Sequence, residues 1–76
     1  MLTRKDLIAA GTAVCDALKK EQERPALKGP DNEPRYAARG VCVRIMNDLY
    51  YMAPEKVRAS FEYSSEAFFT ACGWPE

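Results

Sequence analysis

Apolar residues recur every three or four positions along most of the chain, the spacing expected of helices that bury one face. The segment 4–24 is the first such helix, because Thr3 can cap the amide of Asp6 at its start and Pro25 cannot continue it. Gly11 lies in the middle of the apolar face, so it either admits another helix at close range or is simply tolerated. This face comprises Leu7, Ile8, Gly11, Val14, Cys15 and Leu18.

The segment 33–52 is predicted to be a second helix, and its apolar residues form two stripes rather than one. The first stripe, which we expect to face the core, comprises Ala38, Val41, Cys42, Ile45, Leu49 and Met52. The second comprises Tyr36, Gly40, Val43, Asn47 and Tyr50. At about 100° per residue, the two stripe centres lie more than about 100° apart around the helix. The second stripe is therefore either a contact surface for a partner or the side on which a central helix meets further helices of its own chain.

The chain from Pro54 onward predicts two shorter helices, at 54–62 and 65–72, although one helix bent near 63–65 fits the same pattern. Ser64 or Ser65 is a candidate N-cap for the last helix. Gly73 is placed to end that helix in a left-handed conformation, which lets Trp74 fold back on Phe69. Since strand-like alternation is missing, the predicted fold is an all-α bundle of three to four helices.

The 76 residues are predicted to form a single helical domain, 1–76, with a proline-rich loop at 25–34. This loop is long for a connection between two helices. It either spans one end of the bundle or contributes to a binding surface.

Charge and cysteine content narrow the classes of function. The 11 basic and 11 acidic residues cancel, so the chain lacks the positive charge of a simple nucleic-acid binder. We expect neither a signal peptide nor a membrane partner, because charged residues precede any apolar run and no such run reaches ten residues. The three cysteines are an odd number and widely spaced, so we expect them to pack in the core and not to act as reactive thiols. The same pattern favours a reducing, cytoplasmic location.

No catalytic chemistry is predicted. The chain has no histidine, so it lacks both the usual general base near neutral pH and the commonest metal ligand. It also lacks glycine-rich phosphate-binding motifs and a nucleophile elbow. We therefore expect a protein that is not an enzyme and that holds neither a cofactor nor a metal ion.

The tyrosine-bearing second stripe is the strongest functional signal, because tyrosine is enriched at protein interfaces. We expect a non-catalytic protein-binding module that occupies a surface of a larger protein, or that self-associates through this helix. Accessory and inhibitory proteins of phages and mobile elements, anti-CRISPR proteins among them, fit this expectation. Similar chain length is the only basis for that comparison. The predicted partner-binding residues are Tyr36, Arg39, Gly40, Val43, Arg44, Asn47, Tyr50 and Tyr51.

The alternative is a small nucleic-acid-binding protein in which the segments 33–52 and 54–62 form a helix-turn-helix. Arginines of the first segment, with Lys56 and Arg58 of the second, would then contact phosphates. The turn at Ala53–Pro54 is short for that motif, and the segment 54–62 carries two acids against two bases. Nucleic acid is therefore the less favoured partner.

Overall fold

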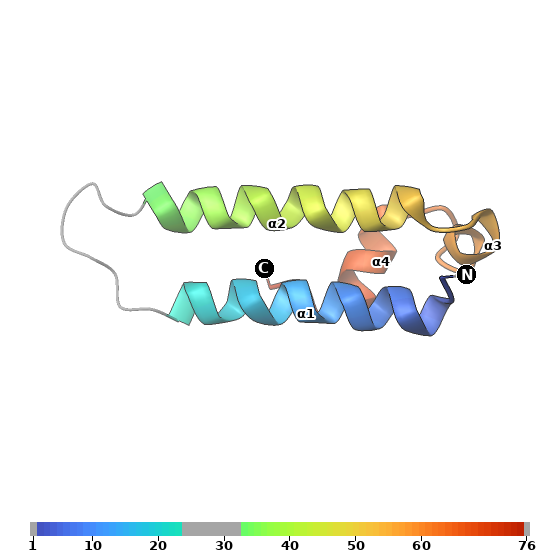
Figure 1. Cartoon of the computed structure of the whole chain (residues 1–76), viewed down its shortest axis with the longest axis horizontal. Helices are drawn as coiled ribbons and strands as arrows, with labels where there is room; N and C mark the ends of the chain where they lie inside the picture. Colours follow the sequence, from blue (N-terminus) through green and yellow to red (C-terminus); the bar gives the residue numbers. More distant parts are fainter. Residues whose placement is uncertain (1, 24–32, 76) are drawn as a thin grey trace.

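The computed structural model describes residues 2–23 and 33–75, and of residues 33–36 only the backbone. In this part of the chain there are four helices and no strand: α1 (Arg4–Glu23), α2 (Glu33–Met52), α3 (Glu55–Ala59) and α4 (Ser65–Ala71) (Figure 1). The predicted all-α bundle is confirmed. Most of the predicted loop 25–34 lies outside the described residues, and its last two positions belong to α2.

Helices α1 and α2 run antiparallel, side by side, as a long hairpin (Figure 1). Helix α4 lies across the hairpin near the end that carries α3, and it packs on both long helices. The short helices therefore cover only one part of the hairpin.

Side-chain caps begin α1 and α4. The Oγ1 atom of Thr3 accepts a hydrogen bond from the amide of Asp6 (3.1 Å), and Oδ2 of Asp6 accepts one from the amide of Thr3 (3.3 Å). At the start of α4, Oγ of Ser64 accepts from the amide of Ala67 (3.1 Å). Both caps satisfy backbone amides that have no partner within their helix, and both are predicted from the sequence.

Helix α3 is shorter than predicted, because the chain turns sharply after it. Pro54 is its N-cap rather than its first residue, and Ser60 is its C-cap. Glu62 and Tyr63 then adopt left-handed backbone conformations, with φ values of 56° and 57°. Each costs roughly 1–2 kcal/mol for a residue with a Cβ. Burial of Phe61 in the core immediately before this turn offsets the cost.

The end of α4 has the predicted geometry. Gly73 has a φ of +82°, and the amide of Trp74 donates a hydrogen bond to the carbonyl of Phe69 (3.1 Å). This left-handed ending turns the chain back along α4. The ring centroids of Trp74 and Phe69 consequently lie 5.0 Å apart, which confirms the predicted contact.

The core is centred on Phe68 of α4, whose side chain has no exposed surface. Its ring lies 5.5 Å from that of Phe61 and 6.1 Å from that of Tyr50, measured between centroids. On the α1 side it meets Gly11, where an added Cβ would lie 2.9 Å from Cζ of Phe68 and would overlap Sγ of Cys72. Gly11 therefore admits α4 at close range, and it is not merely tolerated.

The buried face of α2 differs from the predicted one. Met46, which belongs to neither stripe, is fully buried, and Tyr50 is 2% exposed. Three residues of the predicted core-facing stripe are exposed instead: Val41 (57%), Ile45 (41%) and Met52 (80%). The prediction was wrong for these three because α1 and α4 both pack on the same half of α2, and the five-residue α3 does not cover the other half.

Among the described helices, none is long and apolar enough to cross a membrane.

The packing at Gly11 predicts opposite effects for two glycine-to-alanine substitutions. Gly11→Ala should lower the free energy of unfolding by about 1–3 kcal/mol, because the new methyl group pushes Phe68 and Cys72 away from α1. Gly40→Ala, on the exposed side of α2 with nothing within 4 Å of its Cβ position, should raise it by up to about 1 kcal/mol. Urea unfolding followed by circular dichroism measures both. If Gly11→Ala were as stabilising as Gly40→Ala, the close approach of α4 would be wrong.

Candidate functional site

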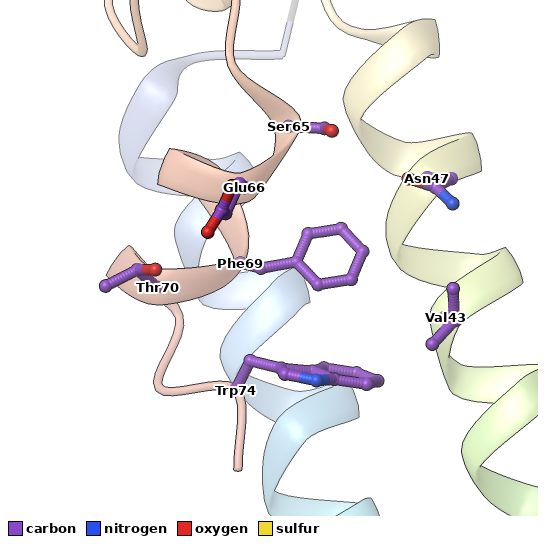
Figure 2. A pocket seen from close by; sticks show the side chains of 7 residues that line it. All are labelled: Val43, Asn47, Ser65, Glu66, Phe69, Thr70 and Trp74. Carbon is purple, nitrogen blue, oxygen red and sulfur yellow. The ribbon is translucent and has the colours of Figure 1, made fainter. Parts of the chain in front are cut away.

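An open groove of about 400 Å³ lies between α2 and α4 (Figure 2). Its volume falls within the range of about 300–1,000 Å³ typical of ligand pockets. One wall comes from α2, the other from α4 and the residues that follow it. The lining residues are Val43, Asn47, Ser65, Glu66, Phe69, Thr70 and Trp74.

The aromatic side chains of the groove are positioned by the end of α4. Phe68 and Phe69 are consecutive, so about 100° of helical rotation separates them: Phe68 enters the core and Phe69 reaches the groove. The left-handed Gly73 brings Trp74 back beside Phe69. Figure 2 shows both rings directed across the groove toward α2, where Val43 lies.

Arg39 of α2 holds the C-terminal segment in place. Its Nη2 atom donates a hydrogen bond to the carbonyl of Pro75 (3.1 Å), and its Cζ atom lies 5.2 Å from the centroid of the Trp74 ring. A guanidinium over an indole face contributes about 0.5–1 kcal/mol at an exposed site. Arg39 therefore binds within its own chain, although the sequence analysis included it among the partner-binding residues.

Polar side chains line the groove together with the apolar ones. Asn47, Ser65 and Thr70 supply one amide and two hydroxyl groups, which can both donate and accept hydrogen bonds. Glu66 adds the one carboxylate among the seven lining residues, which include no basic side chain. Such a lining can bind an apolar side chain and orient the polar groups beside it.

A second hollow of about 520 Å³ lies between the start of α1 and α3. Its lining is largely apolar and contains no aromatic side chain. The groove between α2 and α4 is the stronger candidate of the two, because it combines aromatic and polar side chains. The second hollow is lined by Leu2, Thr3, Pro54, Glu55, Lys56 and Val57.

The structure divides the predicted partner-binding residues. Val43 and Asn47 line the groove, and Gly40, Arg44 and Tyr51 are exposed on α2. Tyr50 is buried in the core, which agrees with the second interpretation of its stripe and not with a partner-binding role: α4 covers it, and its ring packs against that of Phe68. Tyr36 belongs to α2, but its side chain lies outside the described part.

The wall contributed by α4 is missing from the sequence prediction. The contact of Trp74 with Phe69 is predictable from Gly73, but it does not indicate which helix the pair faces. The missing information is the packing of Phe68 against Gly11, which joins residues far apart in the chain. The signal that was available is the pair of adjacent phenylalanines, since about 100° of helical rotation separates them and directs their side chains toward different neighbours.

The buried thiols are poor nucleophiles. Burial raises the pKa of Cys72 to about 11, with the neighbouring Cys15 as a smaller cause in the same direction. Burial also raises the pKa of Cys15. Both groups therefore remain protonated thiols near neutral pH, and the thiolate is the reactive form. Within the described residues, no three side chains of the metal-binding types come together to hold an ion.

No protein-family model, curated protein or solved structure matches the chain. The function proposed below therefore rests on the geometry of the chain itself.

The contacts of Arg39 predict that its removal releases the only tryptophan of the chain. Arg39→Ala should shift the fluorescence emission of Trp74 to longer wavelength and lower the free energy of unfolding by about 1–2 kcal/mol, because one hydrogen bond and one cation–π contact are lost. Arg44→Ala, at an exposed position of the same helix, is the matched control and should leave the emission unchanged. Equal spectra for the two variants would contradict the docking of the C-terminal segment.

Proposed function

We propose that this chain is a non-catalytic protein-binding module that receives one large apolar side chain of its partner in the groove between α2 and α4. The observation that supports this function is the open groove itself, with two aromatic side chains in one wall. Protein interfaces concentrate their binding energy where an anchor side chain enters a pocket of this kind.

The chemistry of the lining narrows the anchor. Phe69 and Trp74 favour an aromatic or long aliphatic side chain, since paired aromatic rings add about 0.5–1.5 kcal/mol beyond the area they bury. Asn47 can bond to the backbone or polar groups beside the anchor. Glu66 favours a partner with a lysine or arginine next to the anchor and disfavours an acidic neighbour.

An inhibitory or accessory role of the kind found among phages and mobile elements, anti-CRISPR proteins included, is one form of this proposed function. The helix-turn-helix alternative has little support, because its recognition helix would be the five-residue α3, in which Glu55 offsets one of two basic residues.

A random peptide display library selected on the immobilised chain tests the proposal. We expect enriched peptides to share an aromatic or long aliphatic residue beside a basic one, and a synthetic copy to change the fluorescence of Trp74. Thr70→Arg should weaken peptide binding at least about tenfold, because the new side chain fills the groove and repels the basic neighbour. Asn47→Ala should weaken it about five- to tenfold through the lost hydrogen bond.

The matched control is Ala13→Arg, which adds the same side chain at an exposed position of α1. It should bind the peptide as the unmodified chain does. The proposal is wrong if no peptide is enriched, or if the affinity of the enriched peptides is the same for Thr70→Arg and Ala13→Arg.

A further inference from the structure

Helix α2 carries a second apolar surface that no described element covers. This surface is an outer stripe formed by Val41, Ile45 and Met52. Ile45 follows Val41 by four positions and Met52 follows Ile45 by seven, so all three lie on one side of the helix. Their exposed fractions are 57%, 41% and 80%. The groove residue Val43 lies more than about 100° around α2 from the centre of this stripe. The outer stripe and the groove are therefore separate surfaces.

Two opposite charges accompany the outer stripe. Arg44 and Asp48 are both exposed and lie one helical turn apart. An arginine that precedes its acidic partner by four positions is in the weaker order for a pair within one helix. The same spacing suits a pair between two helices that cross in opposite directions.

Along the helix, the centre of the stripe and the centre of the charge pair lie half a residue apart. The midpoint of Val41 and Met52 falls between positions 46 and 47, and the midpoint of Arg44 and Asp48 falls at position 46. A two-fold axis at this point would bring each residue of such a pair next to its counterpart on a second, antiparallel α2. Val41 of each copy would then contact Met52 of the other. Arg44 of each copy would likewise pair with Asp48 of the other, which gives two ion pairs.

We propose that a second copy of this chain docks on the outer stripe, with the two α2 helices antiparallel and related by a two-fold axis that passes beside the stripe at the level of positions 46 and 47. The charges of this face are self-complementary, as a two-fold interface requires. About three turns of one helix are involved, so the buried area falls in the class below about 1,200 Å² in total that characterises weak complexes. The dimer is therefore concentration-dependent, and it leaves the grooves of both copies open.

Sedimentation equilibrium between about 5 µM and 1 mM tests the dimer, with circular dichroism to verify the fold of each variant. The unmodified chain should shift from monomer to dimer across this range. Arg44→Asp should weaken association at least about tenfold, because it replaces two attractions by two repulsions. The double variant Arg44→Asp with Asp48→Arg should restore it, since the swapped charges pair again across the axis. Val41→Arg should abolish it.

Lys5→Asp, which makes the same change of charge at an exposed position of α1, is the matched control and should not alter association. Three results would overturn the proposal: a chain that stays monomeric at every concentration, a dimer that Arg44→Asp and Val41→Arg leave intact, and a double variant that fails to recover. The proposal would also be wrong if Thr70→Arg, and not Arg44→Asp or Val41→Arg, separated the dimer. That result would place self-association in the groove.

Discussion

The packing of Phe68 against Gly11 is the contact on which the rest of this molecule depends. A helix as short as α4 has little stability of its own, so its position comes from the apolar surface it buries. Phe68 supplies that surface, and the missing side chain at Gly11 gives it room beside α1. The same ring contacts Tyr50 of α2, so a single side chain joins both long helices to the short one. Stability and the position of the groove are therefore set by the same contact.

This one-sided packing explains why α2 carries two different surfaces. Helices α1 and α4 occupy neighbouring sides of it, and α3 is too short to cover the remainder. Where α2 and α4 diverge, Phe69 and Trp74 stand opposite Val43 and form the groove. On the uncovered side, Val41, Ile45 and Met52 form the outer stripe. An additional long helix would have buried this stripe in an ordinary four-helix arrangement. Because no such helix is present among the described elements, the outer stripe stays exposed.

The features that the sequence predicts correctly are those decided within a few residues. The caps at Thr3 and Ser64 and the left-handed Gly73 depend on backbone groups nearby, and each is where its residue type indicates. The buried face of α2 is different, because apolar residues occupy most of its circumference and several faces fit the periodicity equally well. The packing of α1 and α4 together selects the face that contains Met46. The sequence therefore predicts one wall of the groove, from Val43 and Asn47, and misses the wall that α4 provides.

The most direct test of this arrangement is a nuclear Overhauser experiment on the isotope-labelled chain in solution. We expect contacts between the ring protons of Phe68 and the α-protons of Gly11, and between the indole of Trp74 and the side-chain protons of Arg39. The first contact reports on the docking of α4, and the second on the groove. A spectrum that contains the contacts of the α1–α2 hairpin but neither of these would mean that α4 does not pack across it, and both proposed surfaces would lose their basis.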